Sequence, residues 1–253
     1  MLFDSHAHYN DGRFLDDVDE ILGSMLKNNV GYIMNACSDI SEIPYILKLA
    51  EKYSFLYASV GVHPHEVSDM TESDIDILKE YANHPKVKAI GEIGLDYYYD
   101  NAPRDLQKKW FARQIELALE IDMPIIIHDR DAHKDCLDIL KQYRGVKGVF
   151  HCYSGSAEML SEVLDLGLYV AFGGSVTFKK SQKPVEAAKA APLDKILIET
   201  DCPYLTPEPF RGKRNSSLYI HLVAEKLAEI KNMSVEEIEN ITLQNAKKCF
   251  MID

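Results

Sequence analysis

Two histidines one residue apart end the first apolar run of the sequence. His6 and His8 close the segment 2–8. If this segment is a β-strand, both imidazoles project to the same face, because side-chain direction repeats every two residues, and together they can offer two nitrogens to one cation. A strand can also simply end in polar residues. A metal site becomes the better interpretation only if further ligand-type residues lie nearby.

Further histidines and carboxylates occur at the ends of later apolar runs. Glu92 is set in the apolar segment 89–95, where an unpaired carboxylate is costly to bury. A salt bridge to a strand lysine or arginine is the alternative, but no strand run places a basic residue opposite it. Glu92 is therefore expected to need a cation. The other polar residues at run ends are His63, His65, His128, His151 and Asp201.

The elements that must position these residues alternate along the whole chain. Amphipathic stretches with helical spacing, such as 106–121, separate short apolar runs rich in β-forming residues. Parallel strands require such crossovers, so the pattern predicts an α/β fold, a (β/α)8 TIM barrel in one domain spanning residues 1–253. The eight predicted strands are 2–8, 30–37, 55–62, 87–94, 124–128, 146–151, 168–173 and 196–201.

A doubly wound open sheet is the main alternative fold, but no G-x-G-x-x-G follows the first strand. The segment 218–250 holds two more helical stretches, and we expect the second to begin at Ser234 with Glu237 completing a capping box. In a barrel of this kind catalytic groups lie at the carboxyl ends of the strands. By this rule His84, His133 and His221 fall outside the site, because they precede a strand or lie on helices.

Composition narrows the classes of function. The formal charge is −12, from 28 basic and 40 acidic residues, which argues against a broad nucleic-acid-coating surface but allows local basic loops. No apolar run approaches the roughly 20 residues that span a bilayer, so no membrane partner is expected. The five cysteines are dispersed without a C-x-x-C pair, which is typical of reduced thiols in a cytoplasmic protein. We expect Cys152 and Cys202 to face away from the metal.

Six motifs in order resemble the TatD-like deoxyribonuclease family of the metal-dependent amidohydrolase superfamily. They span nearly the whole chain, and their order is more specific than any one of them. They are DSHAH at 4–8, GVHPH at 61–65, GEIGLDY at 91–97, PIIIH at 124–128, HCYSG at 151–155 and ETDCPYL at 199–205.

The resemblance implies two divalent metal ions per chain. His6, His8 and Asp201 would hold one ion, His128 and His151 the other, and Glu92 would bridge them. Many relatives in the wider superfamily use a modified lysine at the fourth strand, so Glu92 favours the TatD-like branch. Histidine and carboxylate ligands suit magnesium, zinc and manganese, which leaves the identity of the metal open.

The hypothesis that follows is a deoxyribonuclease. Paired metals lower the pKa of a water molecule and clamp the oxygens of a phosphodiester. We hypothesise that Asp201 orients that water as general base, while His63, or else His65, contacts the phosphate or the leaving group. The resemblance suggests trimming of single-stranded DNA or DNA ends in the 3′ to 5′ direction. No obligate protein partner is indicated.

Substrate contacts must come from loops above the site. Lys179, with Lys180 and Lys183, follows the seventh strand, and Arg211, Lys213 and Arg214 follow the eighth. Both clusters can grip a phosphate backbone, although solvated lysines are the ordinary alternative. Tyr97 and the two tyrosines after it can stack a terminal base or pack as a lid.

Two other functions compete with DNA cleavage. The same activated water can attack a carbonyl, which would make the protein an ester or amide hydrolase such as an aminoacyl-RNA deacylase. A metalloprotein that uses its cluster only for stability is the non-enzymatic alternative. A closed structural site, however, does not need the surplus histidines His63 and His65.

Overall fold

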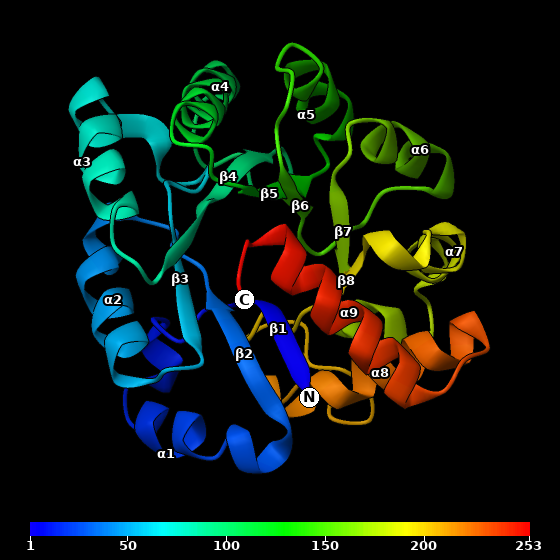
Figure 1. Ribbon diagram of the computed structural model, residues 1–253. Helices are drawn as coiled ribbons and strands as arrows, with labels where there is room; N and C mark the ends of the chain where they lie inside the picture. The colour runs from blue at the N-terminus through cyan, green and yellow to red at the C-terminus, as the bar shows by residue number, and fades with distance from the viewer.

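The protein is a barrel of eight parallel strands surrounded by helices, in a computed structural model that describes residues 1–253 (Figure 1). Neighbouring strands pair in sequence order from β1 to β8, as parallel strands joined by right-handed helical crossovers do. This confirms the predicted (β/α)8 barrel. The strands are β1 (Leu2–Ala7), β2 (Val30–Asn35), β3 (Leu56–Val60), β4 (Val87–Asp96), β5 (Ile125–Arg130), β6 (Gly148–Phe150), β7 (Tyr169–Phe172) and β8 (Ile196–Ile198).

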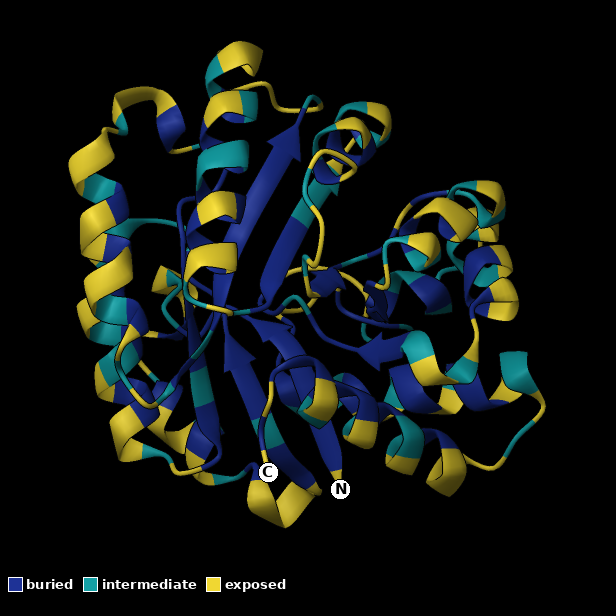
Figure 2. Cartoon of the chain, turned by 45° about the horizontal axis from the view of Figure 1, so that its top comes forward, coloured by how far each residue is buried: buried dark blue, intermediate teal, exposed yellow.

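Helices cover the outside of the barrel, with buried residues toward the strands and exposed residues outward (Figure 2). The predicted capping box at Ser234 is present, with Glu237 as its partner. No helix combines the length and the apolar character that crossing a membrane requires. The helices are α1 (Val18–Gly23), α2 (Ile43–Lys52), α3 (Glu72–Ala82), α4 (Arg104–Glu120), α5 (His133–Leu140), α6 (Ala157–Asp165), α7 (Gln182–Ala190), α8 (Ile220–Lys231) and α9 (Val235–Cys249).

The barrel has two apolar cores because strand side chains alternate between its two faces. The larger core packs the outer face of the strands against the helices. The smaller one gathers inward-facing residues such as Phe3, Ile126 and Leu197, together with Phe250 and Ile252 at the end of α9. Figure 1 shows α9 crossing the barrel axis at the amino ends of the strands. The end of α9 therefore forms the floor of the barrel.

Several strands end at other residues than the sequence predicted: β2 and β3 end two residues early, β5 continues to Arg130, and the differences in β4 and β8 bear directly on the site. Strand β4 continues to Asp96, two residues past the predicted end, and pairs there with β5. Gly94 permits this pairing: its φ is +148°, and a Cβ at this position would lie 1.9 Å from the His128 carbonyl oxygen. Strand β8 ends early at Ile198, and Asp201 lies beyond it with a φ of +54°.

The barrel closes between β1 and β8 by a thin contact. The only bridge there joins Ala7 and Cys202. Two backbone hydrogen bonds flank it, from Asp201 N to His6 O at 2.9 Å and from His8 N to Cys202 O at 2.8 Å. We call this junction the seam. It lies directly beside the first histidine pair.

Candidate metal centre

All six predicted metal ligands converge at the carboxyl ends of the strands. His6 and His8 come from the end of β1, and Glu92 lies within β4. His6, His8, Glu92 and His151 are buried, and His128 and Asp201 are only slightly exposed. The other ligands come from β5 and from just after β6 and β8; they are His128, His151 and Asp201.

One oxygen of the Glu92 carboxylate faces the seam. Glu92 Oε2 lies 3.3 Å from His6 Nε2 and 3.6 Å from His8 Nε2. The two histidine nitrogens are 3.0 Å apart. Asp201 Oδ1 completes the group, 3.8 Å from His6 Nε2 and 3.6 Å from His8 Nε2. We call this group of donors the seam pocket.

The other Glu92 oxygen faces a second group of histidines. Glu92 Oε1 lies 2.6 Å from His128 Nδ1 and 2.8 Å from His151 Nε2, and these two nitrogens are 3.2 Å apart. His63 Nε2 is 3.6 Å from the same oxygen. We call this group the ladder pocket, because β4 pairs with β5 on both sides of an irregularity between Ile90 and Ile93, and β5 pairs with β6. Glu92 is shared by both pockets.

The donor atoms fit metal ions in spacing and in chemistry. Ligands at 2.0–2.1 Å from a tetrahedral ion lie about 3.4 Å from one another. The nitrogen and oxygen atoms of the seam pocket are 3.0–3.8 Å apart, and those of the ladder pocket 2.6–3.6 Å. Five histidines around one buried carboxylate form a donor set for divalent cations.

The electrostatic environment of this centre favours a negatively charged Glu92. Burial tends to raise the pKa of Glu92, but the surrounding imidazoles of His151, His63 and His6 hold that pKa well below its usual range. Burial lowers the pKa of His63 well below its usual value and also lowers the pKa of His6. Against the effect of burial, neighbouring carboxylates raise the pKa of His8, His128 and His151. Metal binding at these three imidazoles would therefore release protons, because the unprotonated form is the one that binds metal.

Asp96 is a buried carboxylate to which sequence reasoning gave no role. Its Oδ2 lies 3.1 Å from His128 Nε2 and 3.0 Å from His65 Nε2. Its Oδ1 accepts hydrogen bonds from the amides of Tyr98 and Tyr99. Asp96 thus orients a predicted ligand and holds the following loop, as carboxylates behind ligand histidines do. The sequence places this acidic residue two positions after Gly94. The predicted strand ended at Gly94, and the acidic residue was therefore not recognised as part of the strand.

Glu199 is a second buried carboxylate without a predicted role. Its Oε1 accepts a hydrogen bond from the Cys152 amide at 2.6 Å and lies 3.6 Å from His151 Nδ1. His6 stacks on His151 with ring centroids 4.0 Å apart, and Glu199 forms a compact cluster with both histidines. His6 Nδ1, His151 Nδ1 and Glu199 Oε2 are buried and have no hydrogen-bond partner. Glu199 therefore sits behind one ligand of each pocket.

The residues predicted to contact substrate differ in the direction and the exposure of their side chains. His65 contacts Asp96 and stacks edge-on against Tyr99. Tyr97 points its hydroxyl away from the ligands and donates to Asp135 at 2.7 Å, so the exposed rings of this loop are those of Tyr98 and Tyr99.

The two basic loops meet each other. The Arg211 guanidinium lies 3.8 Å from the centre of the Phe178 ring, and Phe178 directly precedes Lys179. Lys179, Arg211 and Lys213 are exposed and form no ion pair within 4.0 Å. By contrast, Arg214 is paired with Asp17. The first three therefore remain open to an anionic ligand.

The cysteines take no part in the donor clusters. Each cluster of at least three possible metal-binding side chains consists of histidines and glutamates. Four of the five thiols are buried, and Cys152 is partly buried; all are free. Cys152 contributes its backbone amide to Glu199.

Comparison with known proteins matches this arrangement to one family. The model of the TatD-related DNase family matches residues 3–251. The chain is 48% identical to the uncharacterized metal-dependent hydrolase YabD of Bacillus subtilis, with all of both chains covered, and 36% identical to YcfH of Escherichia coli, covering 100% of this chain and 97% of that protein.

A solved structure agrees with the sequence relatives. The crystal structure of YjjV, a TatD homologue from Escherichia coli, superimposes with a TM-score of 0.94 at 28% identity, covering 100% of this chain and 98% of that one. The family match includes every predicted ligand and all of the eight strands except Leu2, the first residue of β1. The chain therefore belongs to the TatD-related DNase family, a family of metal-dependent hydrolases.

Proposed function

We propose that the protein hydrolyses phosphodiester bonds of DNA, trimming single strands or 3′ ends, with two divalent ions held on either side of Glu92. The observation that carries this proposal is the division of Glu92 between two pockets, with Oε2 toward His6 and His8 and Oε1 toward His128 and His151. A carboxylate placed between two donor groups is suited to bridging two cations. The family description supplies the substrate class.

The proposed ligands have different roles. In this proposal His6, His8 and Asp201 hold the seam ion, and His128 and His151 hold the ladder ion. When bound, such ions lower the pKa of water and stabilise charge on phosphoryl oxygens. Asp201 also accepts the proton of the attacking water, because its carboxylate lies at the edge of the seam pocket and is 15% exposed.

Two histidines beyond the proposed ligands are suited to contact the substrate. His63 Nε2 faces Glu92 Oε1 at 3.6 Å, and its lowered pKa leaves a neutral imidazole that can donate one hydrogen bond to a phosphoryl or leaving-group oxygen. His65 is more exposed and is held by Asp96. The basic surface of Lys179, Arg211 and Lys213 would then attract the DNA backbone.

The test is digestion of single-stranded DNA labelled at the 5′ or the 3′ end, with magnesium, manganese or zinc added to metal-free protein. We expect metal-dependent shortening from the 3′ end and loss of cleavage, by at least about 10³-fold, in Asp201→Asn. His221→Ala is the matched control, because His221 lies on α8, where its Nδ1 is 2.9 Å from the Leu218 carbonyl oxygen.

The same protein preparations should be assayed with RNA, carboxylic esters and amides. Cleavage of an ester or aminoacyl bond with no cleavage of DNA would replace the proposed substrate while retaining the metal centre. Full metal content with no turnover of any substrate would contradict an enzymatic role. Shortening of the strand from its 5′ end would support a nuclease but would show that it acts in the direction opposite to the proposed one.

A further inference from the structure

Arg130 is an unpaired cation at the rim of the metal centre. It is the last residue of β5, two positions after His128. Its side chain is exposed, forms no hydrogen bond and has no carboxylate within 4.0 Å. Sequence reasoning passed over it because no other basic residue stands beside it.

Two aromatic rings hold the Arg130 guanidinium in place. Its central carbon lies 4.2 Å from the centre of the Tyr98 ring and 4.7 Å from that of Tyr99. The two rings are nearly perpendicular to one another, and Asp96 fixes the backbone of both tyrosines. Contacts with ring faces use none of the five N–H donors of arginine. The cation is thus positioned while its donors stay free.

A chain of contacts connects this cation with the ladder pocket. Tyr99 packs edge-on against His65, and His65 and His128 share Asp96 Oδ2. His128 and Arg130 lie two residues apart on β5, so their side chains leave the same face of the strand about 6.6 Å apart along it, with Arg130 further toward the rim. A phosphate bound by Arg130 would then be a neighbour of the phosphate placed beside Glu92.

We propose that Arg130 binds a non-scissile phosphate of the DNA strand, with Tyr98 and Tyr99 as positioning residues for its guanidinium. This inference rests on the proposed DNA-cleaving function. Arginine suits the role because its planar fork can donate two parallel hydrogen bonds to one phosphate. Arg130 would supply a second phosphate contact, in addition to the cluster of Lys179, Arg211 and Lys213. Aromatic rings hold this second contact in position.

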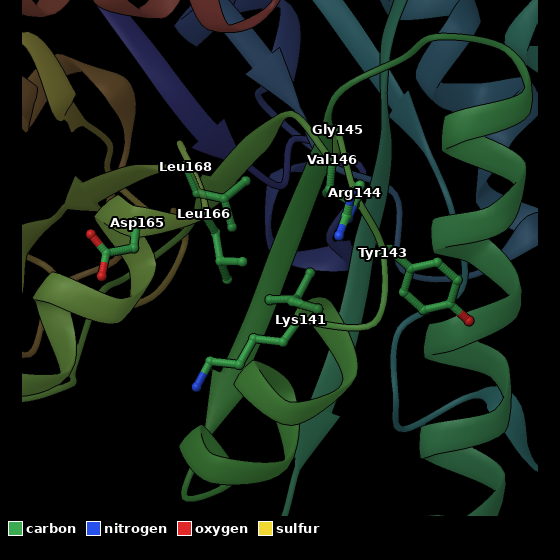
Figure 3. A pocket seen from close by; sticks show the side chains of 9 residues that line it. Lys141, Tyr143, Arg144, Gly145, Val146, Asp165, Leu166 and Leu168 are labelled. Atoms are coloured by element: carbon green, nitrogen blue, oxygen red, sulfur yellow. The ribbon is translucent and has the colours of Figure 1, made fainter.

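The chain offers a matched control in Arg144. This arginine is also exposed and without an ion pair, but it precedes β6 and borders a cavity of about 240 Å³ at the opposite end of the strands (Figure 3). Arg130→Ala and Arg144→Ala remove the same charge from the protein. A difference in DNA binding between the two variants therefore reports the position of the arginine, because both variants change the net charge equally.

The binding test uses a fluorescein-labelled 12-nucleotide thymidine strand in magnesium buffer and protein carrying Asp201→Asn, so that the probe is not consumed. Every variant carries this substitution, so any effect on the seam ion is the same in all of them. We expect Arg130→Ala to weaken binding about tenfold and to reduce the slope of log K against log salt by about 0.7, the value for one phosphate contact on a single strand. Arg144→Ala should change neither quantity. An unchanged slope in Arg130→Ala overturns the inference.

The cleavage test compares the 12-nucleotide strand with thymidylyl-thymidine, which has a single phosphate, using protein with Asp201 intact. We expect Arg130→Ala to reduce kcat/KM at least fivefold more for the long strand than for the dinucleotide, and Arg130→Lys to recover part of the difference. Equal losses on both substrates overturn the role of Arg130. If the unsubstituted protein cleaves neither substrate, the proposed function itself fails, and the two failures are distinguishable.

Discussion

The seam pocket and the ladder pocket share Glu92 but are built differently. In the ladder pocket, β4 pairs with β5 at Ile90 and again from Ile93 to Asp96, with an irregularity around Glu92, and β5 pairs with β6, so backbone pairing joins the strands that carry the ligands. The seam pocket straddles β1 and the segment after β8, which share a single bridge. The comparison teaches that similar donor sets can be preorganised to different extents.

Side chains strengthen the seam where the backbone does not. The buried carboxylate of Asp4 accepts hydrogen bonds from the Thr200 amide at 2.9 Å, from the Thr200 hydroxyl at 2.6 Å and from the Ser217 hydroxyl at 2.6 Å. Ser5 adds a hydrogen bond to the Ile198 carbonyl oxygen. Metal bound between His6 and Asp201 would add one more connection between β1 and the segment after β8.

The largest effect is expected from Glu92→Gln, because it alters both pockets at once. Removing the shared negative charge should lower metal content in both pockets and reduce cleavage by at least about 10³-fold. Elemental analysis and a turnover assay measure the two effects, with circular dichroism to confirm folding. Glu51→Gln, at an exposed glutamate beside His84, is the control. Retention of both ions would show that Glu92 does not bridge them.

Single-ligand substitutions should separate the pockets. His6→Ala is expected to lose the seam ion and retain the ladder ion, and His128→Ala the reverse, each with a fall in cleavage of about 10²-fold or more. Metal titration by calorimetry, monitored as the number of ions bound, makes the distinction. Loss of both ions in both variants would mean that the pockets form a single cooperative site.

Metal removal should loosen the seam more than the ladder. An ion that binds only the folded protein stabilises it, by about 2.7 kcal/mol at a concentration of 100 Kd. After chelation we expect faster hydrogen exchange at the amides of Asp201 and His8, which bond across the seam, than at the amide of His151, which bonds to Ile127. Equal changes at all three amides would remove the proposed difference.

The smallest effect is expected from Thr200→Val, which deletes one hydroxyl that supports the seam. Leaving Asp4 without this donor should lower the free energy of unfolding by about 1–3 kcal/mol. Urea denaturation of metal-free protein measures the change. Ser59→Ala, which deletes the hydroxyl that donates to the Gly91 carbonyl oxygen, provides a counterpart away from the seam. A change below about 0.5 kcal/mol in Thr200→Val would show that the Thr200 hydroxyl does not support the seam.

The sequence predicted the barrel and the convergence of the six proposed ligands because both depend on strong local signals. Apolar runs marked the strands, and polar residues at their ends marked one rim, so His128 and Asp201 needed no knowledge of tertiary contacts. The roles of Asp96, Glu199 and Arg130 were missed. Each acts through a side chain from another strand or loop, and no spacing in the sequence reports on His65 meeting Asp96 or Tyr98 meeting Arg130.

The floor that α9 makes under the barrel has a practical consequence. Phe250 and Ile252 pack among the inward-facing residues at the amino ends of the strands and close that end of the barrel interior. Metal and substrate must therefore reach the donors around Glu92 from the carboxyl ends of the strands. A compound bound across that rim would block both, so an inhibitor of this protein need not displace a metal ion to be effective.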